Sequence, residues 1–167
     1  MKVSPAIAGL FYSVTLYKQR YMMRSYLIIL LFILPFVCIA QSGKTEKEIF
    51  NLVNEYRHKK GLHELKYLDA AANEAATHSN RMAKRLTGFG HGGFDGRFRR
   101  LKRKYPRMMG CAENVAYGAK DGKAAVNMWL HSSGHKRNIK GDYTHTGVGI
   151  ARGRKGVIYY TQIFVRM

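Results

Sequence analysis

The chain has 167 residues and carries 29 Lys and Arg against 10 Asp and Glu, a formal net charge of +19. This length allows one domain with a hydrophobic core, and the charge favours anionic partners. Two cysteines are too few for a small disulfide-stapled scaffold, which excludes that class of secreted protein.

The first recognisable segment is a leader over residues 22–41. A basic start precedes eleven apolar residues from Leu27 to Val37, and small residues follow. A membrane-spanning helix needs roughly 20 apolar residues, so this run predicts a signal peptide, with cleavage after Ala40. Cys38 also allows a lipoprotein anchor, but Val37 stands where such anchors have a smaller residue.

This leader sets the expected organisation and location of the protein. Residues 1–40 are an N-terminal extension plus signal peptide, and residues 41–167 are a single domain. The first part contains four of the 29 basic residues and no acidic one, so the predicted mature protein has 25 basic and 10 acidic residues, a net charge of +15. We therefore expect a secreted or periplasmic protein. Its one remaining cysteine, Cys111, cannot form an internal disulfide, so the domain is expected to hold together by packing or to pair with another chain.

Two helices are expected in the first half of the predicted domain. Thr45 and Glu48 have the spacing of a capping box, and apolar residues follow at helical spacing until Gly61. A second helix is expected to start at Asp69, as its cap, and to run through an alanine-rich segment. Those small residues permit close approach to a neighbouring layer. A glycine-rich loop over residues 87–96 follows.

A strongly basic helix is predicted between Phe94 and Pro106. Apolar residues keep one face of it, while seven of the eleven residues from Arg97 to Arg107 are Lys or Arg. Such a face can bind a polyanion or an anionic membrane surface electrostatically. The alternative is a solvated helix that keeps a basic protein soluble. The expected polyanion-binding residues are Arg97, Arg99, Arg100, Lys102, Arg103 and Lys104.

The last third of the chain predicts a helix and then a hairpin. Trp129 and Ser132 fall at helical spacing in a helix that is expected to end near Gly134. Residues 144–164 alternate β-branched and aromatic residues on both sides of the turn RGRKG, which predicts two antiparallel strands. Helices that come first and strands that come last indicate a layered α+β domain.

Polar candidate residues concentrate in three short segments. These are GHGGF with His91, CAENVAYG with Glu113 and Asn114, and WLHSSGHKRNI with His131 and His135. In this order, and followed by YYTQIF, they resemble the CAP superfamily, the SCP-like domains of cysteine-rich secretory proteins, antigen-5 allergens and plant pathogenesis-related proteins, in the shorter bacterial form. We expect Asn114 to cap a following helix.

The resemblance implies a three-layer α-β-α sandwich with a central cavity. Two histidines and two glutamates line that cavity in the family, and in some members they form a divalent-metal site. The matching residues here are His91, Glu113 and His135. The second glutamate is replaced by Ser132, so the four-residue set is incomplete. We expect His91, Glu113, Ser132 and His135 to line the cavity.

The two expected cavity histidines also suggest a metal. Neutral imidazoles at His91 and His135 can ligate zinc or another divalent cation. Catalytic zinc normally takes three protein ligands, so two predict weak, exchangeable binding unless Glu113 also coordinates. One alternative is that both histidines only hydrogen-bond nearby loops. Another pairs His131 with His135 four residues apart, which would need an unbroken helix.

For function, these observations favour a binding module for an envelope or extracellular ligand. The ligand is expected to be a lipid in a groove between layers or an anionic polysaccharide on the basic face, with peripheral membrane contact as a further option. The main alternative is a metal-assisted hydrolase that uses His91, His135 and Glu113, with Glu113 as the base. A structural protein with a vestigial cavity is the third class.

The sequence gives less support to two other functions, a thiol protease and a nucleic-acid-binding protein. Cys111 next to Glu113 permits a thiol protease, but a small buried cysteine is the commoner case. The sequence contains no recognised nucleic-acid-binding motif, so no specific nucleic-acid partner is expected. Whether the protein is an enzyme stays open at this point.

Overall fold

The computed structural model describes residues 43–167, which belong to the second of two compact units, Ser42–Met167. The predicted signal peptide and its cleavage after Ala40 lie outside the described residues. Residues 43–59 form the first described helix. The following elements are β1 (Lys66–Tyr67), α2 (Asp69–Ala83), α3 (Phe94–Lys104), β2 (Gly110–Tyr117), α4 (Gly122–Leu130), α5 (Ser133–Lys140), β3 (His145–Arg152), the 3₁₀ turn η1 (Arg154–Gly156) and β4 (Ile158–Arg166).

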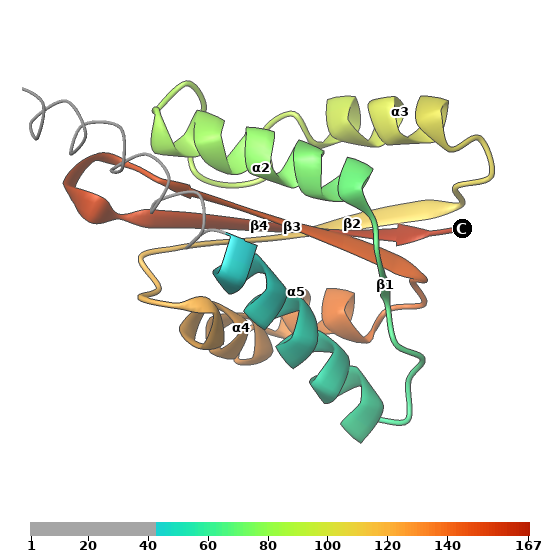
Figure 1. Cartoon of the computed structure of the whole chain (residues 1–167). Helices are drawn as coiled ribbons and strands as arrows, with labels where there is room; N and C mark the ends of the chain where they lie inside the picture. Colours follow the sequence, from blue (N-terminus) through green and yellow to red (C-terminus); the bar gives the residue numbers. More distant parts are fainter. Residues whose placement is uncertain (1–42) are drawn as a thin grey trace, which may run out of the picture. The chain divides into compact units, whose positions relative to one another are not determined.

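The strands form a four-stranded sheet in the order β1-β3-β4-β2. Strand β1 is parallel to β3, and the other two pairings are antiparallel. Helices α2 and α3 cover one face of the sheet, whereas α4, α5 and the helix of residues 43–59 cover the other (Figure 1). The predicted three-layer α-β-α sandwich and the predicted β3–β4 hairpin are therefore confirmed.

Each face of the sheet has its own hydrophobic core, because successive strand residues point to opposite faces. Phe164 of β4 packs with Trp129 in the layer of α4 and α5, whereas Ile163 and Val165 pack with α2 and α3. Trp129 is fully buried, and its indole nitrogen donates to the carbonyl of Val115 at 3.2 Å. This bond ties α4 to strand β2.

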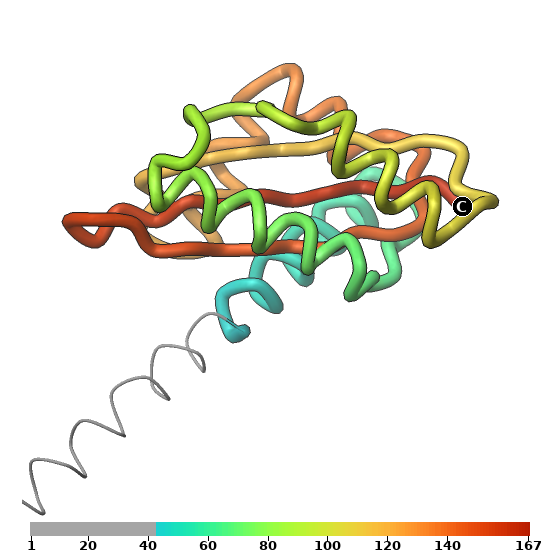
Figure 2. Tube along the Cα trace, turned by 90° about the horizontal axis from the view of Figure 1, so that it is seen from above, coloured from blue at the N-terminus to red at the C-terminus, as the bar shows by residue number. Residues whose placement is uncertain are grey.

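Helix α2 lies directly on the hairpin, along the direction of its strands (Figure 2). Two glycines of β3 allow this approach. A Cβ atom added at Gly149 would lie 1.9 Å from the backbone nitrogen of Ala76, and one added at Gly147 would lie 2.0 Å from that of Ala72. The small residues of α2 were expected to permit such close packing, and the structure shows that glycine on the strand is needed as well.

Several expected boundaries were wrong. Residues 43 and 44 are already helical, so Thr45 does not start the first helix. The N-cap of α2 is Leu68, and Asp69 is the first helical residue. Gly134 does not end a helix but lies near the start of α5, because the chain leaves α4 after Leu130 and begins a new helix at Ser133.

Strand β2 was missed because its sequence carries polar residues where a buried strand normally carries apolar ones. Asn114 lies inside this strand and is fully buried, so it does not cap a helix. The cap of α4 is Asp121, whose carboxylate accepts a hydrogen bond from the backbone nitrogen of Ala124 at 2.7 Å. The polar residues of β2 are instead paired within the site.

Candidate functional site

The site is built around the carboxylate of Glu113, in the middle of β2. Glu113 is 5% exposed and lies on the same side of the strand as Cys111, toward α2 and α3. A buried carboxylate must be paired to remain charged. Both of its oxygens accept hydrogen bonds from the guanidinium of Arg97, at 2.7 and 2.8 Å. This two-point geometry is the strongest that an arginine can offer a carboxylate.

Arg97 also connects the glycine-rich loop to the site. The residue is 5% exposed, and its guanidinium donates to the carbonyl of Gly92 at 2.9 Å. The expectation that Arg97 belongs to an exposed polyanion-binding face was therefore wrong. It lies four residues before the buried Leu101, on the inward face of α3, and its charge is already used by Glu113.

His91 reaches the same carboxylate from the loop before α3. Its Nδ1 lies 3.0 Å from Oε1 of Glu113. Because a carboxylate oxygen only accepts, this nitrogen carries the proton, and Nε2 is left without a hydrogen-bond partner among residues 43–167. The side chain is 52% exposed. The structure therefore brings His91 and Glu113 together with the reactive edge of the imidazole directed away from the carboxylate.

His135 is held beside Glu113 through the backbone of α5. Asn114 donates to the carbonyl of His135 at 3.1 Å, while Asn138 donates to the carbonyl of Glu113 at 3.2 Å and to the side-chain oxygen of Asn114 at 2.9 Å. Partial burial lowers the pKa of His135, and the nearby charge of His91 lowers it further. The charge of His91 thus acts on His135, which places the two expected histidines near one another, His91 in the loop before α3 and His135 in α5.

The other expected residues of this segment, Ser132 and His131, make no side-chain hydrogen bond to Glu113, Asn114 or His135. Ser132 is the N-cap of α5, but its hydroxyl caps no backbone nitrogen and makes no side-chain hydrogen bond within residues 43–167. Nδ1 of His131 donates to the carbonyl of Asn127 in its own helix, at 2.8 Å. His131 lies at the end of α4 and His135 in α5, so the alternative pair on one unbroken helix does not form.

Sequence reasoning missed His78, which was interpreted as an ordinary histidine. It is 1% exposed, its Nε2 lies 2.7 Å from the carbonyl of Gly90, and the same nitrogen lies 3.9 Å from Oε1 of Glu113. Burial lowers its pKa. A usable signal was present, because His78 follows Ala71 and Ala75 on the buried stripe of α2, where a polar side chain needs a specific partner.

The family model for the cysteine-rich secretory protein family, CAP, matches residues 50–164. The chain belongs to the CAP family. The Bacillus subtilis membrane protein YlbC is 38% identical to this chain over 125 residues, which make up 73% of this chain and 34% of YlbC. The Bacillus subtilis protein YkwD is 31% identical over 107 residues, 62% of this chain and 41% of YkwD. Both relatives are thus more than twice as long as the matched domain.

Solved structures show the same CAP fold. An extracellular protein containing an SCP domain from Bacillus anthracis is 30% identical, with a TM-score of 0.63 over 75% of this chain and 41% of the other. An outer surface protein of Borrelia burgdorferi has a TM-score of 0.64 over 74% of this chain and 92% of the other, at 21% identity. The second likeness concerns the fold alone.

The CAP site described here is poorly suited to a tightly held metal. Among residues 43–167, no three His, Cys, Asp or Glu side chains form a group that could hold a metal ion. Arg97 and His91 already occupy three of the roughly four acceptor positions of the Glu113 carboxylate, which disfavours this group as a third ligand beside His91 and His135. A weak zinc site on two imidazoles stays a prediction. The same ion pair disfavours Glu113 as a hydrolytic base, since taking a proton would break it.

Cys111 does not behave as a nucleophile in this CAP domain. Burial, together with the negative charge of Glu113, raises the pKa of its thiol to about 12. A reactive cysteine needs the opposite shift and an imidazole within reach. The only hydrogen-bond acceptor near its sulfur, within the described part of the chain, is the carbonyl of Ala112 at 4.0 Å. The structure therefore argues against a thiol protease.

The remaining cations of α3 differ in how free they are. Arg100 forms two 2.7 Å hydrogen bonds to Glu74, and Lys102 donates to the carbonyls of Pro106 and Met108. Three further residues are exposed and have no ion pair within residues 43–167: Arg99, Arg103 and Lys104. These three residues are called the α3 cation set below. They are the expected polyanion-binding residues whose charge is available to a partner.

Proposed function

We propose that the chain is an exported CAP domain that binds an acidic polysaccharide of the cell envelope or its surroundings. The observation that carries this proposal is the α3 cation set, Arg99, Arg103 and Lys104, whose charges are exposed and unpaired on a domain with a net charge of +15. A polymer of fixed negative charges gains affinity from several such contacts at once, because each contact releases condensed counterions.

Export is supported by the predicted signal peptide and by the names of similar proteins. One similar structure is an extracellular protein, and one relative is named a membrane protein. Among residues 43–167, no helix has the length and apolar character to cross a bilayer. An exported domain lies outside the cytoplasm, where envelope polysaccharides are accessible.

Binding to dextran sulfate, with unsulfated dextran as the neutral control, tests the proposal. The variant Arg99→Gln, Arg103→Gln, Lys104→Gln removes the α3 cation set, and we expect it to bind dextran sulfate at least tenfold more weakly than the wild type at about 0.1 M salt. A matched variant removes three exposed cations of α5 instead: Lys136→Gln, Arg137→Gln and Lys140→Gln.

Equal losses in the two triple variants would show that only net charge matters and would contradict the proposed face. Wild-type binding to unsulfated dextran with equal affinity would contradict the electrostatic mechanism itself. The expected result is a large loss for the α3 variant, a small one for the α5 variant, and no measurable binding of the neutral polymer.

A lipid is the second candidate ligand, because one groove has suitable walls. It lies between the helix of residues 43–59 and α4 and has a volume of about 580 Å³. Leu52 and Leu130 contribute apolar surface, Lys59 and Lys123 also line the groove, and the hydroxyl of Tyr56 is buried without a partner within the described residues. Binding of a fatty acid in this groove is expected to be nearly independent of salt, which distinguishes it from polymer binding.

A further inference from the structure

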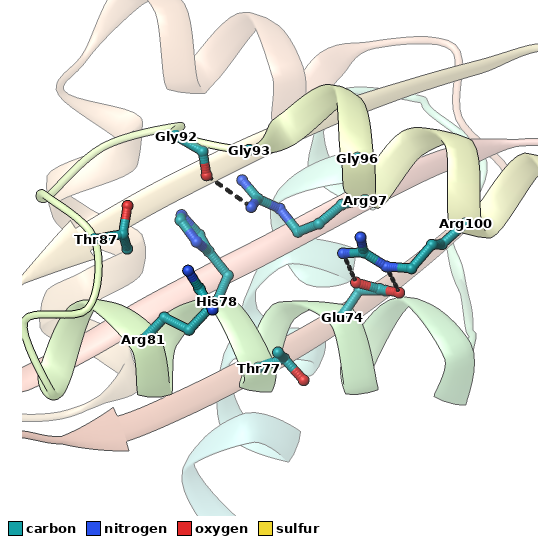
Figure 3. A pocket seen from close by; sticks show the side chains of 10 residues that line it. All are labelled: Glu74, Thr77, His78, Arg81, Thr87, Gly92, Gly93, Gly96, Arg97 and Arg100. Atoms are coloured by element: carbon teal, nitrogen blue, oxygen red, sulfur yellow. Dashed lines mark hydrogen bonds and ion pairs between the residues drawn. The ribbon is translucent and has the colours of Figure 1, made fainter.

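A second pocket lies on the opposite side of the sheet, between α2 and the start of α3. Its volume is about 560 Å³, within the range of about 300–1,000 Å³ that is typical of small-molecule sites. In Figure 3 the side chains of His78 and Arg81 rise from α2 toward the loop that carries Thr87 and Gly92. The pair of Glu74 and Arg100 lies to the other side of the pocket.

His78, which lines this pocket, has one ring nitrogen without a hydrogen-bond partner among residues 43–167. Its Nε2 must carry the proton, because it faces the carbonyl of Gly90, which can only accept. In the neutral ring, Nδ1 then has a bare lone pair. This atom is buried and has no partner within residues 43–167, although the residue lines the pocket. A buried polar atom of this kind normally has a partner, so a hydroxyl or N–H group is expected to donate to it.

Arg81 contributes the free positive charge. Its side chain is exposed on the last turn of α2, and it forms no ion pair within the described residues. The other two arginines of the pocket are already neutralised, Arg97 by Glu113 and Arg100 by Glu74. The pocket therefore has one unpaired cation and one unpaired buried acceptor, with no unpaired carboxylate among its lining residues.

We propose that this pocket binds a small anion that also carries a hydroxyl group, such as a polyol phosphate. Its anionic oxygens accept hydrogen bonds from the guanidinium of Arg81, and its hydroxyl donates to Nδ1 of His78. Each functional group of the ligand then meets the pocket group that lacks a partner. This assignment concerns a different set of residues from the α3 cation set and does not depend on polymer binding.

Titration of the purified protein with glycerol 3-phosphate at about pH 8 tests the assignment, with the histidine ring signals followed by NMR. We expect saturable binding, a shift of the His78 signals, and affinity about tenfold weaker in Arg81→Gln, which loses a charged hydrogen bond. Arg137→Gln removes the same charge from an exposed position on α5, outside the pocket, and is expected to change the affinity less than twofold.

Methyl phosphate provides the ligand control, because it retains the charge and lacks the hydroxyl. Glycerol 3-phosphate is expected to bind more tightly than methyl phosphate and to shift the His78 signals more. The proposal is overturned by any of three results: no saturable binding of glycerol 3-phosphate, equal weakening by Arg81→Gln and Arg137→Gln, or equal affinity for the two phosphates with no change at His78.

Discussion

Arg97 compensates the buried negative charge of the Glu113 carboxylate at the centre of the site. Glu113 has 1% of its side chain exposed and Arg97 has 6%, so neither charge has much access to water. Burial of two charges is costly, and the pair adds little net stability compared with an apolar pair of the same shape. The removal of one partner is different, because it leaves the other charge buried without compensation.

We therefore predict that Arg97→Ala destabilises the fold by about 3–5 kcal/mol, whereas Arg99→Ala, on the exposed side of the same helix, changes the free energy of unfolding by about 0.5 kcal/mol or less. Urea unfolding followed by circular dichroism measures both. Similar values for the two variants would mean that the ion pair does not support the fold.

One buried and one partly buried histidine make the stability depend on pH. Burial lowers the pKa of His78 and of His135 below the usual histidine value of 6.5. Below that value the unfolded chain takes up protons that the folded protein does not bind, so the folded state loses stability as the pH falls. The stability is fully present above about pH 6.5 and decreases toward the lowered values.

The predicted slope is up to about 1.4 kcal/mol per pH unit for each such histidine, between about pH 6.5 and its folded pKa. The variant His78→Gln is expected to show a smaller slope than the wild type in unfolding experiments from pH 7.5 to 5.5, whatever its stability at pH 7.5. Parallel curves for the two proteins would contradict a neutral, buried His78.

At this scale, sequence reasoning found some residues and missed others for a physical reason. The family resemblance placed His91, Glu113 and His135 together, because short motifs carry these residues. His78 has no motif of its own, and Arg97 is one of seven basic residues in a run of eleven. Only the tertiary contact with Glu113 separates Arg97 from its exposed neighbours.

At the scale of elements, the contact between α2 and β3 depends on the missing side chains of two glycines. Helix α2 lies so close that a Cβ atom at Gly149 would overlap the backbone of Ala76. The backbone cannot move aside as a flexible side chain would. The two elements would have to separate, and the core between them would lose contacts.

Gly149→Ala is therefore expected to destabilise the domain by about 3 kcal/mol or more, the upper end for overpacking. Gly134→Ala is the matched control, because a Cβ atom there meets nothing within 4 Å and the residue lies in helix α5. It should leave the stability unchanged or raise it by about 0.5–1 kcal/mol. Thermal unfolding of both variants provides the test, and a well-tolerated Gly149→Ala would refute the close contact.

Sequence patterns were informative for elements with a regular apolar repeat, such as α2, α3 and the β3–β4 hairpin. They failed for β2 and α5. Strand β2 contains Glu113 and Asn114, which are polar because they pair with other elements, and α5 is short and has a single buried residue, Ile139. Propensity and periodicity do not register such tertiary pairing.

At the scale of the whole molecule, the three-layer arrangement was predicted through the family resemblance, and the layered α+β class through the order of the elements. The sequence did not predict which of the basic residues are paired with carboxylates and which are free. Helix α3 contains six of the seven basic residues between Arg97 and Arg107, and only part of their charge is available, because Arg97 and Arg100 are paired with carboxylates. The proposed function depends on the charges that remain.

The salt dependence of dextran sulfate binding is the most direct test of that function. The affinity of the wild type should fall steeply and linearly with the logarithm of the salt concentration. Without the α3 cation set, the slope should be shallower by about two, because up to three ionic contacts are lost. Identical slopes for the wild type and this variant, or an affinity of the wild type that does not change with salt, would contradict the proposal.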